Sequence, residues 1–300
     1  MRYLGQHTIM DQRTILITGA NDGIGRATAA RLAERGFRLV LACRDGGAAM
    51  KTARDLMDRS GNEQIFSLQC DLADFSSVAA GAEEFLAEYP ALDVLINNAG
   101  VYTDTLSHTA DGYEYQFGVN YLGHFLLTNL LLPALRCADD ARVVNVSSAL
   151  HAKGQIDFGN LRGERGAAAY SGTDAYAQSK LANVLFTMEL ARRYAGEFTA
   201  NALHPGIVAT NLANKDAGWI TSCVWRMYKP FARPPKKGAQ TSIYLAASPE
   251  VRDVTGRYFD ECQCLRAPSA TSRDEALARR LWEWSEGAVA GVASNGGWKE

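Results

Sequence analysis

The stretch Thr14-Ile-Leu-Ile-Thr-Gly-Ala-Asn-Asp-Gly-Ile-Gly25 decides how this chain folds. Its first five residues are β-branched or apolar and predict a buried strand. Glycines at 19, 23 and 25 predict a tight turn into a helix that begins near Gly25. At such a turn the backbone can approach a pyrophosphate, because free N–H groups and the helix dipole favour anions. The spacing of these glycines differs from the G-x-G-x-x-G dinucleotide fingerprint by two extra residues before the second glycine. The turn alone is therefore an incomplete indication of dinucleotide binding.

Working outward from this stretch, short β-branched runs alternate with helical patterns. The near-continuous apolar character of the runs suits strands that are covered on both faces of a parallel sheet. The alternation predicts an α/β fold, a Rossmann-type doubly wound parallel sheet in one domain over 1–300. The expected strands are 14–18, 38–42, 65–69, 94–97, 142–146, 200–204 and 256–259, and the expected helices are 25–35, 48–60, 76–89, 111–136 and one that follows Asp174.

Three segments fall outside this alternation. Residues 1–12 are expected to form an N-terminal extension, and residues 286–300, rich in Gly and Ala, a C-terminal tail that frays. Residues 213–237 are rich in aromatic side chains and follow a strand end, where a substrate-covering flap would sit. The alternative for 213–237 is a structural insertion that packs on the surface or at an interface. Its large side chains are Trp219, Trp225, Met227, Tyr228 and Phe231.

The composition excludes several classes of function. The chain of 300 residues is 47% hydrophobic and 21% charged, which is typical of a soluble globular protein. A formal net charge of −2 gives no basic surface for nucleic acid. Six cysteines are too sparse for a disulfide scaffold, and neither they nor the five histidines have metal-ligand spacing. That spacing leads us to expect no bound metal. No apolar run suits a signal peptide or a membrane span, so we expect a cytoplasmic protein.

Tyr176 and Lys180 indicate acid–base chemistry. Their spacing places both side chains on one helix face, one turn apart. A phenol has an ordinary pKa of ~10, and a nearby ammonium lowers it by favouring the phenolate. A tyrosine tuned in this way can pass a proton to or from a carbonyl or alcohol oxygen. An unrelated Tyr and Lys on a surface helix would show the same spacing, so the pair depends on the other motifs.

Four motifs in order along the chain resemble those of the short-chain dehydrogenase/reductase family. They are Thr18–Gly25, Asn97–Gly100, Ser147–Ser148 and Tyr176–Lys180. The resemblance runs from about Thr14 to Phe259. Further stretches are similar to the retinol-dehydrogenase-like branch, namely 117–125, 179–186, 238–242 and 256–259. The resemblance implies an NADP-dependent oxidoreductase that interconverts a carbonyl and an alcohol on a small hydrophobic molecule.

The resemblance also implies a role for each catalytic residue. Tyr176 matches the acid/base, and Lys180 matches the lysine that lowers the tyrosine pKa and hydrogen-bonds the nicotinamide ribose. Ser148 matches the serine that holds the substrate oxygen, because the family's active serine is usually the second of the pair. Asn120 matches the asparagine that positions a water beside the lysine.

The cofactor contacts follow from the same resemblance. Asp71 matches the acid that hydrogen-bonds the adenine amino group, and the loop 97–100 matches the one beside the adenosine and ribose. The segment after the strand 200–204 matches the one that touches the carboxamide and the phosphates. The expected cofactor-binding residues are Gly19, Asn21, Asp22, Gly23, Ile24, Gly25, Arg44, Asp71, Asn97, Ala99, Gly100, Tyr176, Lys180, Pro205, Gly206, Ile207, Val208 and Thr210.

The choice of cofactor depends on the end of the second strand. NAD-preferring relatives place an Asp there, whereas this chain has Cys43 followed by Arg44, which can pair with a 2′-phosphate. Asp22 argues the other way, because a carboxylate before the second glycine repels that phosphate. Arg26 either compensates for Asp22 or is a solvated helix residue. We therefore favour NADP(H), with NAD(H) as the alternative.

Other functions stay open. A non-catalytic sensor or scaffold could use the same fold to bind the dinucleotide, although such chains typically lose the tyrosine or lysine. A sugar, steroid or polyketide could be the substrate, and the lack of the N-terminal anchor common in the retinol branch argues against a membrane-bound retinoid. A homodimer is also open.

His151 could contact substrate but is expected at the surface, and His204 is expected to pack at a strand end.

Overall fold

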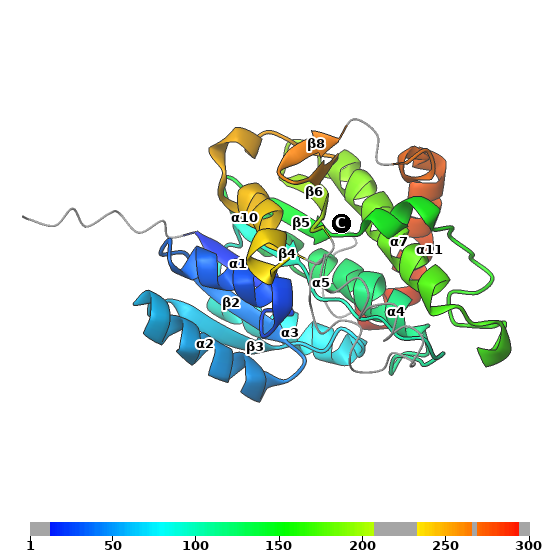
Figure 1. Cartoon of the computed structure of the whole chain (residues 1–300), viewed down its shortest axis with the longest axis horizontal. Coiled ribbons are helices and arrows are strands. Elements are labelled where there is room, and N and C mark those ends of the chain that lie inside the picture. Colours follow the sequence, from blue (N-terminus) through cyan, green and yellow to red (C-terminus); the bar gives the residue numbers. More distant parts are fainter. Residues whose placement is uncertain (1–12, 207–232, 266–268, 294–300) are drawn as a thin grey trace, which may run out of the picture.

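An eight-stranded sheet forms the middle layer of the protein, with strand order β3-β2-β1-β4-β5-β6-β7-β8 (Figure 1). The structure is a computed structural model and describes residues 13–206, 233–265 and 269–293. The strands β1 to β7 run parallel, and β8 pairs antiparallel with β7. The strands are β1 Thr14–Thr18, β2 Arg38–Cys43, β3 Ile65–Gln69, β4 Val94–Asn97, β5 Arg142–Val146, β6 Thr199–His204, β7 Arg257–Asp260 and β8 Gln263–Leu265.

Helices cover both faces of the sheet, which is why β1, β4 and β5 are buried over their whole length. The helices α1, α2 and α10 pack on one face, and α3, α5, α7 and α11 pack on the other. The longer helices are α1 Gly23–Ala33, α2 Gly46–Ser60, α3 Phe75–Glu88, α5 Gly123–Leu130, α7 Gly172–Arg193, α10 Gln240–Ala247 and α11 Glu275–Ala293. The short ones are α4 Tyr115–Phe117, the π-helix Gly118–Leu122, α6 Leu132–Arg136, α9 Pro235–Gly238 and the 3₁₀ turns 149–153, 167–169, 249–251 and 271–273.

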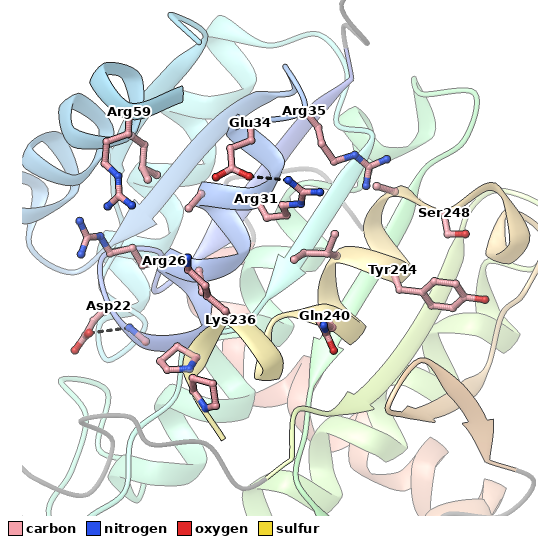
Figure 2. A pocket seen from close by; sticks show the side chains of 18 of the residues that line it. Asp22, Arg26, Arg31, Glu34, Arg35, Arg59, Lys236, Gln240, Tyr244 and Ser248 are labelled. Carbon is pink, nitrogen blue, oxygen red and sulfur yellow. Dashed lines mark hydrogen bonds and ion pairs between the residues drawn. The ribbon is translucent and has the colours of Figure 1, made fainter. Parts of the chain in front are cut away.

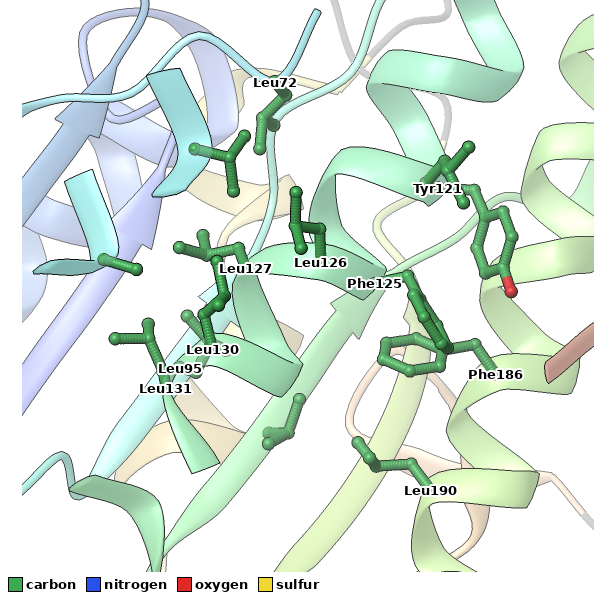
Figure 3. Packing of buried hydrophobic residues seen from close by; sticks show 14 of the residues in the cluster. Leu72, Leu95, Tyr121, Phe125, Leu126, Leu127, Leu130, Leu131, Phe186 and Leu190 are labelled. Atoms are coloured by element: carbon green, nitrogen blue, oxygen red, sulfur yellow. The ribbon is translucent and has the colours of Figure 1, made fainter. Parts of the chain in front are cut away.

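Aromatic packing fixes α7 against the rest of the core. The ring of Phe125 on α5 lies 5.5 Å from that of Phe186 on α7 and 5.0 Å from that of Trp282 on α11. Figure 3 shows Phe125 and Phe186 in contact, with Leu127 and Leu130 of α5 near Leu95 of β4. Since α7 carries Tyr176 and Lys180, this core holds both side chains in place.

The expected fold is confirmed, and all seven expected strands are present with ends within one residue. Helix α1 begins two residues earlier than expected because the Asp22 side chain caps it, and Asp45 caps α2 in the same way. The expected helix 111–136 is wrong as a single element. It begins at Tyr115, where the Glu114 carboxylate accepts from the N–H groups of Gln116 and Phe117. It is then divided by the π-helix and by a break at Leu131.

The expected C-terminal tail also requires correction, because α11 continues past Glu286 to Ala293. Val289 is fully buried in the core, and the Tyr113 hydroxyl donates to the Ala288 carbonyl at 3.2 Å. Packing therefore keeps this Gly- and Ala-rich segment helical. The expected extension 1–12 and all of the expected flap up to residue 232 lie outside the described residues.

Candidate active site

The glycine turn after β1 brings two loops into close contact. Gly19 has a φ of +65°, and a Cβ added there would lie 2.9 Å from the Ala99 Cα. A Cβ on Gly25 would lie 2.3 Å from the carbonyl oxygen of Gly19. Only glycine fits either position, so the backbone stays open at the start of α1. This cradle fits the pyrophosphate of a dinucleotide.

Asp22 occupies part of that cradle. Its Oδ1 accepts from the Gly23 N–H at 2.7 Å, as Figure 2 shows. Arg26, one turn further on, donates to Asp55 at 2.6 Å and is therefore tied to α2. Both residues line a groove of about 1050 Å³ on the outer side of α1, which also reaches α10.

The other adenosine-side residues lie at the carboxyl ends of β2, β3 and β4. Arg44 is exposed beyond the buried Cys43, and its Nη1 donates to the Tyr115 hydroxyl at 3.3 Å. Asp71 follows β3, and its Oδ1 accepts from the Ala73 N–H at 3.0 Å.

Asn97, an expected cofactor contact, has its side chain inside the protein. Its side chain is buried, and its Nδ2 donates to Thr128 at 3.0 Å and to Asn145 at 2.8 Å. The side chain therefore joins β4 to α5 and β5 inside the protein. The neighbouring Asn98, which received no separate role, donates to the Thr18 carbonyl at 2.8 Å and joins the two loops.

Tyr176 and Lys180 lie one turn apart on α7, whose first turn is capped by Ser171. The Lys180 Nζ is 5.5 Å from the centre of the Tyr176 ring and donates to the Val146 carbonyl at 3.1 Å. The helix thus brings the pair together beside the end of β5. Lys180 is almost fully buried, whereas Tyr176 is partly exposed.

Burial dominates the titration of both groups. It raises the pKa of Tyr176 to about 12, against the opposing effect of a hydrogen bond with Ser148. It lowers the pKa of Lys180 to about 8. The expected lowering of the Tyr176 pKa by the ammonium is therefore absent from this structure, because desolvation disfavours the charged form of each group.

The two serines after β5 have different partners. Ser148 begins a 3₁₀ turn, where its Oγ accepts from the Leu150 N–H at 3.2 Å, and its hydroxyl also faces Tyr176. Ser147 is buried, and its hydroxyl donates to the Lys180 carbonyl at 2.8 Å. Ser148 is thus placed to touch a substrate oxygen at Tyr176, and Ser147 supports α7.

Asn120 lies in the π-helix and is fully buried. Its Oδ1 accepts from the Val101 N–H at 2.7 Å, and its Nδ2 donates to the Ser179 Oγ at 3.0 Å. A Cβ added to Gly100 would lie 3.4 Å from the Asn120 Oδ1 and 3.5 Å from the Lys180 Nζ. Asn120, Gly100 and Lys180 therefore meet at one point.

Aromatic residues without an assigned role surround Tyr176. The Tyr102 ring lies 5.7 Å from the Tyr176 ring in an edge-on arrangement. Tyr258 is buried, and burial raises its pKa, with an added effect from the nearby Tyr176. No short motif marks Tyr102, whereas Tyr258 lies in the stretch 256–259 that the sequence singled out.

His151 is buried, which corrects its expected place at the surface. Its Nδ1 lies 2.6 Å from the Ser148 carbonyl, and its ring lies 4.7 Å from the Tyr258 ring. The imidazole is therefore held between the 3₁₀ turn that follows Ser148 and the Tyr258 ring. His204 packs at the end of β6, as expected, where its Nδ1 accepts from the Ala149 N–H at 3.2 Å.

Pro205 and Gly206 follow β6, and Gly206 has a φ of +81°. Ile207, Val208 and Thr210 lie outside the described residues. Across the described ranges, no group of three or more His, Cys, Asp or Glu side chains is placed to hold a metal ion. No helix of those same ranges combines the length and apolarity that crossing a membrane requires.

Comparisons with known proteins agree with this geometry. The family described as short chain dehydrogenase matches residues 13–220. Retinol dehydrogenase 14 of Homo sapiens is 45% identical, over 95% of this chain and 89% of its own length. A solved structure of an uncharacterized protein from Mycobacterium paratuberculosis has a TM-score of 0.73 and 36% identity, covering 93% of this chain and 94% of that one. A short chain dehydrogenase from Escherichia coli CFT073 was solved with NADPH. It has a TM-score of 0.64 and 25% identity, covering 84% of this chain and 97% of that one.

Proposed function

Because the chain belongs to the short-chain dehydrogenase family, in its retinol-dehydrogenase-like branch, we propose that it uses NADP(H) to interconvert a carbonyl and an alcohol on a small hydrophobic molecule. Membership of the family makes it an oxidoreductase acting on CH–OH and C=O groups. The observation that carries the finer proposal is the meeting of Tyr176, Ser148, Lys180 and Asn120 next to the glycine cradle.

Each of these side chains has a place in the proton transfer. When bound, the nicotinamide supplies or accepts the hydride. Tyr176 donates a proton to the developing alkoxide, or removes one from the alcohol, while the Ser148 hydroxyl hydrogen-bonds the same oxygen. Lys180 places its amine 5.5 Å from the centre of the Tyr176 ring, although burial outweighs its effect on the Tyr176 pKa in this structure. Asn120 holds the loop that Gly100 brings to the lysine. Tyr102 forms a wall beside Tyr176.

Arg44 supports NADP(H) over NAD(H). It is exposed at the end of β2, where a guanidinium can pair with a 2′-phosphate. A relative of this fold solved with NADPH agrees with that choice. Asp22 opposes it, since its carboxylate already holds the first N–H group of α1.

A hydrophobic substrate agrees with the rings of Tyr102 and Tyr258 near Tyr176 and with relatives that are named retinol dehydrogenases. A bulky apolar aldehyde or its alcohol, such as a retinoid, is therefore the first substrate to test. The expected cytoplasmic location and the homodimer stay predictions.

The test is a screen of aldehydes, ketones and alcohols with NADPH and NADH in parallel, using wild type and Tyr176→Phe. We expect faster turnover with NADPH and with apolar carbonyls. Tyr176→Phe should reduce turnover ~10²–10⁴-fold and leave NADPH binding, measured by protein fluorescence, unchanged. Tyr244→Phe, on α10, is the matched control and should behave as wild type. Tight NADPH binding without turnover of any compound would favour a sensor instead.

A further inference from the structure

His124 on α5 is a buried titratable side chain that the proposed chemistry does not use. It is 2% exposed, and both of its ring nitrogens have partners. Nδ1 lies 3.0 Å from the carbonyl oxygen of Asn120, and Nε2 lies 2.8 Å from the Thr18 Oγ1. The imidazole therefore connects the π-helix that holds Asn120 with the end of β1.

The chemistry of the partners fixes where the protons lie. A carbonyl oxygen only accepts, so the His124 Nδ1 carries the hydrogen that is donated to Asn120. Burial, aided by the charge of Lys180, lowers the pKa of His124 to about 4, so the ring is neutral at pH 7. Nε2 is then an acceptor, and the Thr18 hydroxyl must donate to it.

The other hydrogen bonds of Thr18 extend this connection to the loop 97–100. Its Oγ1 accepts from the N–H groups of Asn98 at 2.9 Å and of Ala99 at 3.0 Å. The Ile96 carbonyl is a second possible acceptor for its hydroxyl proton, but it lies 3.4 Å away, farther than the His124 Nε2. The preferred arrangement is one directed chain of hydrogen bonds. It runs from the loop 97–100 through Thr18 and His124 to Asn120.

We propose that His124 is a positioning residue that holds the Asn120 carbonyl in register with the loop 97–100. The inference rests on the proposed function, since it takes Asn120 as part of the catalytic set and the loop as part of the cofactor site. The π-helix supports it, because such segments frequently mark functional sites. Severing the Thr18 end should affect the cofactor loop, and severing the Asn120 end should affect catalysis.

Two substitutions of His124 cut the connection at different ends. His124→Asn keeps an N–H near the Nδ1 position and removes the acceptor for Thr18. His124→Gln keeps an acceptor near the Nε2 position and removes the donor for Asn120. Thr18→Val removes the hydroxyl at nearly constant volume, and Thr18→Ser restores it.

In the full chain, we expect His124→Asn and Thr18→Val each to weaken NADPH binding by about tenfold, the effect of one buried hydrogen bond. Thr18→Ser and His124→Gln should bind NADPH within about twofold of wild type. His124→Gln should instead lower kcat by about tenfold with the KM for NADPH little changed. The double variant Thr18→Val/His124→Asn should bind no more weakly than the weaker single variant, because both cut the same connection.

NADPH binding is measured by fluorescence titration without a second substrate. If the wild type turns over no compound, the proposed function is wrong, but the NADPH affinities of the variants can still be compared. Additive losses in the double variant, or identical effects of Asn and Gln at position 124, would overturn the proposal. Nuclear magnetic resonance of ¹⁵N-histidine-labelled wild type needs no variant to fold. It should show an Nδ1–H tautomer that does not titrate between about pH 5 and 9. An Nε2–H tautomer, or titration near pH 6.5, would also overturn it.

Discussion

At the scale of single residues, we propose that two charged side chains, Asp22 and Arg44, set the preference between NADP(H) and NAD(H). Asp22 caps α1 and so stabilises the helix through the Gly23 N–H, one of the groups available to a phosphate at this helix start. Arg44 is exposed at the neighbouring strand end and carries the charge that a 2′-phosphate needs. On this proposal, helix stability and NADPH affinity compete at Asp22.

Asp22→Ser should separate these two effects. Serine caps a helix about as well as aspartate, so the stability of the protein should change little. Removing the negative charge should tighten NADPH binding several-fold, whereas Arg44→Asp should shift preference towards NADH. The Kd values of both nucleotides for both variants provide the measurement. An unchanged NADPH/NADH ratio in Arg44→Asp would remove the basis for favouring NADP(H).

Lys180 is the second residue whose surroundings have a measurable consequence. Its pKa falls from the ordinary 10.5 to about 8 in the folded chain. The unfolded chain therefore binds more protons between pH 8 and 10.5, so stability rises with pH across that window. Charging Lys180 below pH 8 costs the folded state up to about 3 kcal/mol.

Lys180→Met should remove this dependence. Between pH 8 and 10.5, the wild type should gain stability relative to the variant, and the nucleotide-free variant should be the more stable protein at pH 7. Urea unfolding at a series of pH values measures the difference. Lys153→Met, at an exposed lysine, is the matched control and should follow wild type. A constant difference between wild type and Lys180→Met would show that Lys180 does not titrate in this window.

At the scale of elements, the β7–β8 hairpin is the most strained connection among the described residues. Its two turn residues, Glu261 and Cys262, have φ values of +49° and +63°. Two-residue hairpins prefer Asn-Gly or Asp-Gly here, because both positions need positive φ. The Cys262 N–H donates to the Thr241 Oγ1 at 3.2 Å, which helps to hold the turn in place.

Cys262→Gly should therefore stabilise the protein by about 0.5–1 kcal/mol, since it relieves the left-handed strain and keeps the backbone donor. Gly61→Ala is the converse control. Gly61 has a φ of +69° with open space around an added Cβ, so alanine there adds strain without a clash. It should cost about 1 kcal/mol. Urea midpoints measure both, and a destabilised Cys262→Gly would contradict the strain.

At the scale of the whole molecule, cofactor binding and folding are linked. A nucleotide that binds only the folded chain should raise the free energy of unfolding by about 2.7 kcal/mol at 100 times its Kd. Tyr176→Phe should keep this gain, because the phenol hydroxyl acts in proton transfer. Gly25→Ala should lose it, because the new Cβ would lie 2.3 Å from the Gly19 carbonyl. Unfolding with and without NADPH tests both, and a retained gain in Gly25→Ala would place the nucleotide elsewhere.

The sequence by itself determined the strands, the glycine turn and the Tyr176–Lys180 pair. Each depends on local chemistry: apolar runs, positions that only glycine can occupy, and side chains four positions apart on a helix. Such features are independent of what packs from a distance. The doubly wound, largely parallel sheet agrees with the expectation, since alternating strands and helices leave few other topologies.

Only the tertiary structure decided the rest. The sequence does not show that the Asn97 side chain is buried and that its Nδ2 donates to Thr128 and Asn145 from other elements. His151 and His124 are both buried against partners that are distant in sequence. The His151 ring packs against Tyr258, and His124 is hydrogen-bonded to Thr18, 106 residues away. The Gly- and Ala-rich end of α11 stays helical because it packs on the core. Long-range packing and desolvation set these outcomes, and neither leaves a periodic signal in the sequence.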